Sequence, residues 1–415
     1  MTTAEQTAGT AADALAVPEF RRLFLATLVS NTGRWMQFAA LGVLGWELTE
    51  SSAFLGLLIF AQLAPMGILS LVGGSLADTA NRRTLLVSTQ VWQMVWTFVL
   101  AALLIDNTIS TDTLAGLVFI IGLGQGLYAP AFTSILPLVA GEENIQAAVA
   151  LNSVQTNGAR VLGPAIGGFL TSRFGFAEVF AINAMAYLVV IGVLSVLAIP
   201  PSTAKAAQFR DRVFGGFRIV ARAPQVGNPI KIMAAFSLLC LPFIGQLPAI
   251  AEVNLGIDAR SSQYGWFYAM FGLGSLVGAL LVGTVLLSVS KPLLLRLSLV
   301  SFALSLTWLA TIRSVEWAYF AIFFVALFYF TIPTALATLW QEHVDSTVRG
   351  RVAALWVLSF GGVVPIANII AGPLVEATSL DLVLGIGAIG ALGLAIALRV
   401  SSGEIVGEDF LEATT

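Results

Sequence analysis

The sequence Gly73-Gly74-Ser75-Leu76-Ala77-Asp78-Thr79-Ala80-Asn81-Arg82-Arg83 is a short polar connection between two long apolar runs. It places one aspartate and two arginines within about six residues. Charged side chains and non-helical backbone are both costly in hydrocarbon, so this connection is predicted to lie at a membrane surface. The apolar runs on either side are then predicted to be membrane-spanning helices.

The composition of the whole chain leads to the same conclusion. Its 415 residues are 58% hydrophobic and 10% charged, and its mean hydropathy is +0.91, whereas soluble domains contain about 25% charged residues. A single cysteine, Cys240, excludes an internal disulfide and a cysteine-based metal site. The sequence has no Walker-type phosphate loop and no paired-histidine metal motif, so we expect a protein that is not an enzyme and has no cofactor.

Apolar runs of about 20 residues, the length that crosses about 30 Å of hydrocarbon, recur along the chain. They predict an all-α membrane protein with twelve transmembrane helices. The predicted spans are 19–48, 53–75, 84–105, 112–139, 145–172, 176–199, 229–252, 262–287, 292–312, 316–341, 350–376 and 380–399.

One sizeable polar connection, Pro200 to Asn228, divides these spans into two groups of six. Phe209, Val213, Phe217 and Val220 recur there at helical spacing among arginines, which predicts an amphipathic helix lying on an anionic leaflet. A solvated basic loop without lipid contact is the alternative. The predicted organisation begins with a disordered cytoplasmic tail at 1–17 and a six-helix half at 18–200. A linker at 201–228 leads to the second, pseudo-symmetric six-helix half at 229–400, and a second cytoplasmic tail follows at 401–415.

The distribution of basic residues predicts the orientation. With the N-terminus in the cytoplasm, the twenty Lys and Arg residues divide into fifteen inside, three outside and two within helices. This asymmetry predicts that both termini are cytoplasmic. The three outer residues are Arg173, Arg260 and Arg313, and the two within helices are Arg34 and Arg160.

The opening connection resembles the loop between the second and third helices of the major facilitator superfamily. Gly74, Asp78, Arg82 and Arg83 match the family pattern, whereas Thr79 stands where a basic residue is usual. The resemblance implies two six-helix halves that rock about a central cavity. It also implies that Asp78 caps the helix that begins near Arg349 and Gly350, closing the cytoplasmic side. The alternative is a loop that only follows the bias of basic residues toward the cytoplasm.

A second motif lies in the fifth span, at Gly163-Pro164-Ala165-Ile166-Gly167-Gly168. The small residues Gly163, Gly167 and Gly168 allow a neighbouring helix to approach closely, and Pro164 frees a backbone carbonyl and favours a kink. The motif resembles the one found in the fifth helix of exporters in this superfamily. Stretches around Gly216, Trp266 and Gly350 resemble the enterobactin-exporter-like branch, which includes siderophore and drug exporters and is related to lysophospholipid flippases.

The same resemblance implies that the first, fourth, seventh and tenth spans line the cavity. Polar and aromatic residues on these spans and on adjacent helices are candidate substrate-binding residues: each alone is more often a helix-packing contact, but as a group they suffice to orient a large amphipathic molecule. They are Asn31, Arg34, Gln37, Gln62, Gln125, Tyr128, Asn152, Gln155, Arg160, Gln246, Tyr329, Thr331, Thr334, Trp340 and Trp356.

Arg34 and Arg160 are predicted to lie near the middle of the bilayer, where an arginine costs at least about 2.5–3.5 kcal/mol and must face water, a partner or cargo. For Arg160, bonding to backbone carbonyls of a neighbouring helix is an open alternative. No Asp or Glu lies in the middle third of any predicted span. Glu47 and Glu252, at outer ends of spans, are the candidate proton-coupling residues.

A cationic cavity without carboxylates favours neutral or anionic amphipathic cargo. We therefore predict a monomeric secondary transporter of the bacterial inner membrane that exports a siderophore-like or drug-like molecule, coupled to proton influx, in contact with lipid and without a nucleic-acid partner. A lysophospholipid flippase is the nearer alternative. A membrane receptor or scaffold that does not transport is the alternative of another class.

Overall fold

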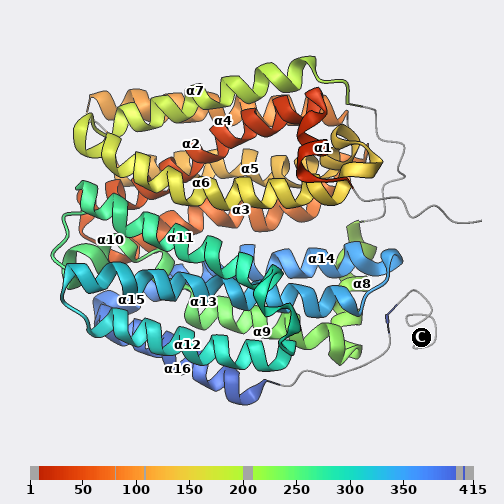
Figure 1. The fold of residues 1–415 in the computed structure, drawn as a ribbon. Coiled ribbons are helices and arrows are strands. Elements are labelled where there is room, and N and C mark those ends of the chain that lie inside the picture. Colours follow the sequence, from red (N-terminus) through yellow and green to blue (C-terminus); the bar gives the residue numbers. More distant parts are fainter. Residues whose placement is uncertain (1–8, 80, 107–108, 200–208, 399–404, 407–415) are drawn as a thin grey trace, which may run out of the picture.

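The computed structural model describes residues 9–79, 81–106, 109–199, 209–398 and 405–406, without the side chains of 70–79, 209–214, 287 and 346. Over these ranges the regular structure is helical, apart from one isolated bridge between Val344 and Val406. Figure 1 shows α1 to α7 packed together as one group and α8 to α16 as a second group beside it.

The first group contains α1 (Ala11–Ala16), α2 (Pro18–Thr49), α3 (Ser52–Thr79), α4 (Arg82–Ile105), α5 (Thr111–Ala140), α6 (Ile145–Arg173) and α7 (Phe176–Val196). The second contains α8 (Phe209–Arg222), α9 (Pro224–Cys240), α10 (Leu247–Ala249), α11 (Ser262–Gly283), α12 (Lys291–Thr311), α13 (Val315–Glu342), α14 (Ser346–Gly361), α15 (Val363–Ala377) and α16 (Leu380–Ala397).

Local chemistry sets many of these helix boundaries. Proline occupies the first turn of α2 and α9, where its missing N–H group leaves no bond unmade. Asn81, Ser110 and Ser261 accept hydrogen bonds from backbone N–H groups at the starts of α4, α5 and α11. The polar connections predicted from the sequence thus act as helix caps.

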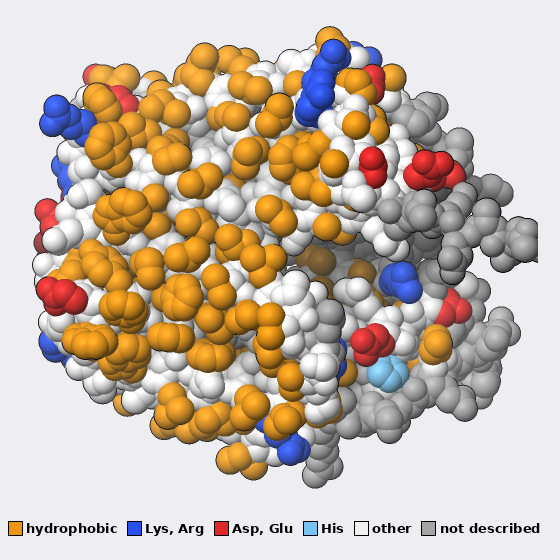
Figure 2. All heavy atoms as spheres, in the orientation of Figure 1, with side chains coloured by type: hydrophobic (Ala, Val, Ile, Leu, Met, Phe, Trp, Pro, Cys, Tyr) orange, Lys and Arg blue, Asp and Glu red, His pale blue; other side chains and the backbone are white. Residues whose placement is uncertain are grey.

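Within the described residues, nine helices are long and apolar enough to cross a membrane, with α14 and α15 counted as one. They are α3, α4, α5, α7, α11, α12, α13, α14 with α15, and α16. Figure 2 shows a broad band of hydrophobic side chains on the outer surface, with charged side chains toward the two ends. The chain is therefore a helical membrane protein.

Three predicted spans, 19–48, 145–172 and 229–252, are not among these nine helices, because the helices there are too polar or too short. α2 and α6 carry arginines and amides, which lower their hydropathy. The predicted span 229–252 is wrong as a single helix, because α9 ends at Cys240 and a short 3₁₀ turn follows at Pro242–Ile244. Pro242 cannot continue a helical hydrogen-bond ladder.

The prediction of a disordered tail over 1–17 is wrong for its second part. Thr10 and Asp13 form a reciprocal capping box at the start of α1, and Ala14 is fully buried. The Gly9 N–H group donates to the carbonyl of Glu143 at 3.0 Å, which ties this segment to the connection between α5 and α6. Residues 1–8 lie outside the described part of the chain.

The predicted amphipathic helix of the linker is present as α8, but its described apolar side chains contact protein. Ile219 and Val220 are buried against residues of α9 and α14, and the backbone of Gly216 packs against Arg351. Phe217 remains half exposed. The lipid contact predicted for this face is thus replaced at Val220 by packing on the second helix group, and the side chains of Phe209 and Val213 lie outside the described part of the chain.

Glycines allow α6 to pack closely against two neighbours. A Cβ atom added at Gly163 would lie 2.6 Å from the Cβ of Trp35 on α2, and Gly167 packs against Met36. Gly168 lies directly against Gly265 of α11, in the other helix group. The close approach predicted for these residues is therefore present, and α6 continues as a helix through Pro164.

We predict that Gly163→Ala lowers the thermal stability of the purified protein, because overpacking typically costs about 1–3 kcal/mol. The matched control is Gly158→Ala on the same helix, where a Cβ atom meets no other atom within 4 Å. That control should be neutral or slightly stabilising. Thermal unfolding in detergent measures both, and equal melting temperatures would contradict this packing.

Candidate functional site

A cavity of about 260 Å³ lies between the two helix groups. Helices of the first group contribute Arg34, Gln37, Gln62 and Gln125, and helices of the second contribute aromatic residues such as Tyr329. In Figure 2 the surface is hollowed between the groups at the end of the molecule where α8 and α14 lie in Figure 1. The cavity is thus central and shared by both groups.

Some of the residues predicted from the sequence line this cavity and others do not. The lining ones are Arg34, Gln37, Gln62, Gln125, Arg160 and Tyr329. Those outside the lining are Asn31, Tyr128, Asn152, Gln155, Gln246, Thr331, Thr334, Trp340 and Trp356.

Several of the residues outside the lining have structural partners. The Gln246 side chain is fully buried and donates to the carbonyl of Ser52 at 3.1 Å. The Thr334 hydroxyl donates to the carbonyl of Phe330 in its own helix at 2.7 Å. Trp340 and Trp356 pack against each other with ring centroids 6.3 Å apart. These contacts serve helix packing, and a role of these residues in cargo binding stays a prediction.

The structure adds cavity residues that sequence analysis missed. Gln93 of α4 and Tyr187 of α7 line the cavity, and the Tyr187 hydroxyl lies 3.5 Å from Gln93 Oε1. Gln37 accepts a hydrogen bond from Asn183, one turn from Tyr187. A polar network therefore covers the first group's side of the cavity. Gln90 and Gln93, one helical turn apart in an apolar run, were the available signal.

The two arginines give the cavity a positive charge. Among its lining residues, all within the described ranges, none is acidic. The guanidinium of Arg34 donates to Asn31 Oδ1 at 3.0 Å. That of Arg160 lies over two rings, 4.6 Å from the Trp35 centroid and 4.1 Å from the Phe330 centroid. Aromatic faces attract a cation and partly replace the water that it has lost.

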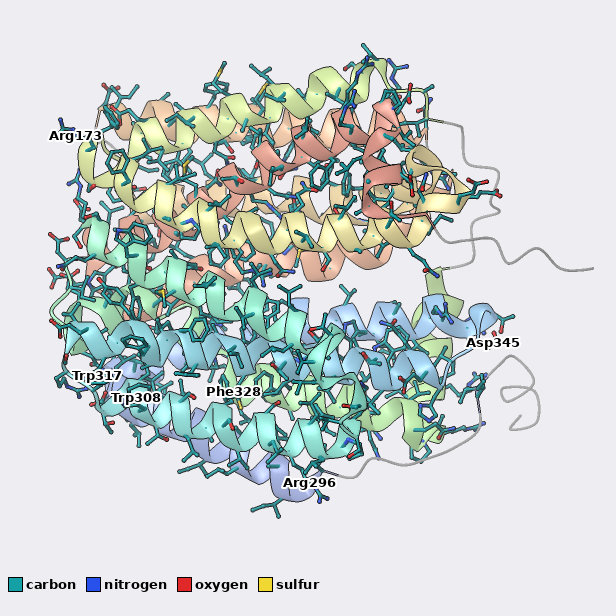
Figure 3. All side chains as sticks on the ribbon, viewed as in Figure 1. Arg173, Arg296, Trp308, Trp317, Phe328 and Asp345 are labelled. Atoms are coloured by element: carbon teal, nitrogen blue, oxygen red, sulfur yellow. The ribbon has the colours of Figure 1, made fainter. Side chains whose placement is uncertain are left out.

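At the opposite end, the two helix groups are in direct contact. Glu376 Oε1, at the end of α15, accepts from the Ser51 hydroxyl at 2.5 Å and from the Ala53 N–H group at 3.0 Å. Arg260 and Glu47 form an ion pair at 3.1 Å between the groups. This end of the cavity is therefore closed. Figure 3 places Arg173, Trp308 and Trp317 toward this end and Asp345 at the other.

Neither predicted proton-coupling residue lies in the cavity. Glu47 is partly exposed in its pair with Arg260, and Glu252 is exposed in a π-helical turn at Ile250–Asn254.

The predicted gate at the other end requires a correction. Helix α14 begins at Ser346, and its cap is Asp345, which accepts hydrogen bonds from the Thr347 N–H and hydroxyl groups. These bonds hold the pKa of Asp345 below its usual value. The Arg349 N–H group already donates to the carbonyl of Asp345. The N–H groups near Arg349 and Gly350 are therefore not the start of a helix.

The remaining gating residues are only partly described. Asn81 caps α4 by accepting from the Thr84 N–H group at 3.2 Å, and the Arg83 side chain is exposed. Arg82 is the first residue of α4. Gly74 and Asp78 belong to the last part of α3, and the side chain of Asp78 lies outside the described part of the chain.

A helical membrane protein with a central cavity between two helix groups is the architecture of a secondary transporter. The chain matches the family described as transmembrane secretion effector over residues 9–409, and it belongs to this family. It is a major facilitator superfamily transporter of the enterobactin-exporter-like kind, and members of this family are not enzymes.

Curated relatives include the enterobactin exporter EntS of Escherichia coli O1:K1 / APEC, which is 25% identical over 346 residues, covering 82% of this chain and 81% of that protein. EntS of Escherichia coli strain UTI89 matches with the same identity and coverage.

Solved structures support the fold. The nucleoside transporter NupG superimposes with a TM-score of 0.73 at 12% identity, covering 90% of this chain and 98% of that one. A bacterial homologue of the human lysosomal transporter Spinster, in an inward-facing conformation, gives a TM-score of 0.66 at 16% identity, with 92% and 94% coverage.

We predict that Ser51→Cys and Glu376→Cys, combined in a Cys240→Ala background, are joined by a short bis-methanethiosulfonate reagent, since their side chains are in contact at the closed end. A protease site is inserted between α7 and α8. After cleavage there, the two cross-linked halves should still migrate together on a non-reducing gel. Each single-cysteine variant is the control. Labelling of both cysteines without cross-linking would contradict a closed end.

Proposed function

We propose that this chain exports a neutral or anionic amphipathic molecule by alternating access, driven by proton influx. The observation that carries the proposal is the central cavity, which contains Arg34 and Arg160, is lined by aromatic and apolar side chains, and has no acidic lining residue. Such a wall disfavours a cationic cargo and suits an apolar body with an uncharged or negative head group. The relative named as an enterobactin exporter supports the export direction.

The proposal includes twelve membrane spans. Beyond the nine apolar helices, α2 and α6 have 32 and 29 residues, which is long enough to cross a bilayer. The broken segment formed by α9 to α10 supplies the twelfth. Polar residues on α2 and α6 face the cavity instead of lipid, which reconciles their low hydropathy with a spanning position.

The proposed orientation places the hollowed end in the cytoplasm, with both termini, in a bacterial inner membrane. Most of the basic residues lie at that end in the prediction from sequence. The cavity then opens toward the cytoplasm in this conformation, so cargo would enter from inside. We propose a monomer as the working unit, because the cavity is enclosed by helices of one chain.

We further propose that Asp78 acts at the cytoplasmic end when the two groups close there. Asp78 lies in the last turn of α3, and α3 packs along α14 and α15. The exposed Arg349 in the first part of α14 offers an opposite charge. This replaces the predicted capping of N–H groups near Arg349 and Gly350.

Asp78→Asn is predicted to reach the membrane in normal amount and to lose most of its transport, because the amide keeps the size of the side chain but not its charge. Uptake into inside-out vesicles measures transport, and immunoblotting of membranes measures assembly. Asp112→Asn, an exposed position at the start of α5, is the matched control and should transport normally. Normal transport by Asp78→Asn would refute the proposed gate.

The proton coupling is tested with the same vesicles, using eight-carbon amphiphiles that differ only in head group. An imposed proton gradient, acidic inside the vesicle, is expected to accelerate uptake of neutral and anionic probes severalfold over no gradient. The variants Glu47→Gln and Glu252→Gln are then compared with the wild type. Substitution of a residue that couples transport to protons should abolish the acceleration by the gradient and leave the uptake without a gradient unchanged.

Uptake at the same rate with and without the gradient would contradict the antiport mechanism and favour a facilitator or flippase, most clearly if a lysophospholipid is transported. Absence of uptake of every probe would favour a receptor or scaffold.

A further inference from the structure

We infer that Arg160, with the hydroxyl of Tyr268, forms a subsite for an oxyanion on the cargo head group, such as a carboxylate or phosphate. The inference rests on the proposed export function and names the part of the cavity that would select the cargo. Both residues line the cavity, from α6 of the first helix group and α11 of the second.

The guanidinium of Arg160 has one edge in use and one edge without a partner. Its Nη1 donates to Asn157 Oδ1 at 3.4 Å. Its Nε is buried and has no hydrogen-bond partner among the described residues. Hydrogen bonds of a guanidinium lie in its plane, and the Nε and Nη2 groups together form a fork that matches two oxygens of one oxyanion.

The surroundings of Arg160 leave this edge as the place for a ligand. The rings of Trp35 and Phe330 pack against the guanidinium, so they stabilise its charge without accepting in-plane hydrogen bonds. No ion pair of Arg160 occurs within the described part of the chain. A buried N–H group without an acceptor is destabilising, and an oxyanion removes that cost.

Tyr268 supplies a second donor. Its side chain is 2% exposed, and its hydroxyl has no partner among the described residues. Tyr264, one turn earlier on α11, also has a buried hydroxyl without a partner, but it does not line this cavity. The two tyrosines thus differ in position and not in chemistry, which makes Tyr264 a matched control.

The other polar residues of the cavity are arranged differently. Gln37 is bonded to Asn183, and Tyr187 lies within hydrogen-bonding distance of Gln93, so these side chains largely satisfy one another. Apolar residues such as Phe38, Leu63 and Phe360 line the remaining wall. The geometry therefore orients an amphiphile with its oxyanion at Arg160 and Tyr268 and its apolar part along these residues.

Binding to the full-length protein in phosphatidylcholine nanodiscs tests the subsite by isothermal titration calorimetry. The probes share an eight-carbon chain: octyl phosphate, octanoate, octyl glucoside and octyltrimethylammonium. Inorganic phosphate alone is a fifth probe. The wild type should bind the two anionic probes at least about tenfold more tightly than octyl glucoside, since charge-assisted bidentate bonds are the strong ones. It should bind inorganic phosphate more weakly than octyl phosphate.

Arg160→Lys keeps the positive charge but removes the fork, so it should reduce the preference for anionic probes about tenfold while binding of octyl glucoside stays the same. Tyr268→Phe should reduce the preference by about threefold or more, and Tyr264→Phe should leave it unchanged. The subsite would be overturned if Arg160→Lys kept the wild-type preference for anionic probes, or if the two tyrosine variants changed that preference equally. Equal affinity for inorganic phosphate and octyl phosphate would also overturn it as a site for cargo.

These outcomes are separable from the proposed function. If the wild type transports the probes into vesicles but the head-group preference survives Arg160→Lys, the subsite is wrong and the export proposal stands. If the preference falls as expected but no probe is transported, the binding site stands and the export proposal is wrong.

Discussion

The cost of placing two guanidinium groups inside a membrane-spanning bundle constrains the rest of this structure. Each arginine at that depth costs at least about 2.5–3.5 kcal/mol unless it finds water, a partner or a ligand. The chain offers Arg34 an amide oxygen and offers Arg160 two aromatic rings and one amide oxygen. Because the cavity lining contains no carboxylate, this compensation is incomplete. An incompletely satisfied cation at a cavity wall is suited to bind an anion reversibly.

Helix α6 links this charge to the packing of the two helix groups. Its glycines lie against α2 on one side and against Gly265 of α11 on another, so its backbone is held close to both. Gly272 of α11 packs against the carbonyl of Arg160 itself, where an added Cβ atom would lie 2.6 Å away. Phe330, which contacts the Arg160 guanidinium, belongs to the second group. A ligand that reorients Arg160 would therefore act on contacts that hold the groups together.

The sequence predicted the parts of this structure that depend on local composition. The apolar runs, the polar connection around Asp78, and the cavity positions of Arg34 and Arg160 follow from the cost of polarity in hydrocarbon. Gln93 and Tyr187 were missed because candidates were drawn from four spans implied by family resemblance and from a few positions on adjacent helices, whereas α7 packs against both α2 and α4 and both residues line the cavity. Gln246 and Trp340 lie outside the cavity lining, since an apolar run does not show which face of its helix meets the cavity.

Helix boundaries could likewise be predicted only in part from local sequence. The start of α14 was predicted four residues late, because Asp345 resembles part of a polar loop until its bonds to Thr347 identify it as a cap. The capping box of α1 could have been found from Thr10 and Asp13, but its stability depends on the burial of Ala14 against helices distant in sequence. Caps are visible in sequence as residue types, and tertiary contacts decide which of them are used.

The two ends of α3 explain how one cavity could open to alternate sides. At its start, Glu376 of the other helix group accepts hydrogen bonds from Ser51 and Ala53, and the partly exposed pair of Glu47 and Arg260 closes the same end. Exposed ion pairs contribute only about 0–1 kcal/mol, so such a closure can be released without unfolding a helix. At the other end of α3, the proposed contact of Asp78 with α14 is of the same modest kind. If Asp78 forms the proposed closure, α3 carries a weak contact at each end, and a small change in free energy from cargo or protons would be enough to favour one closure over the other.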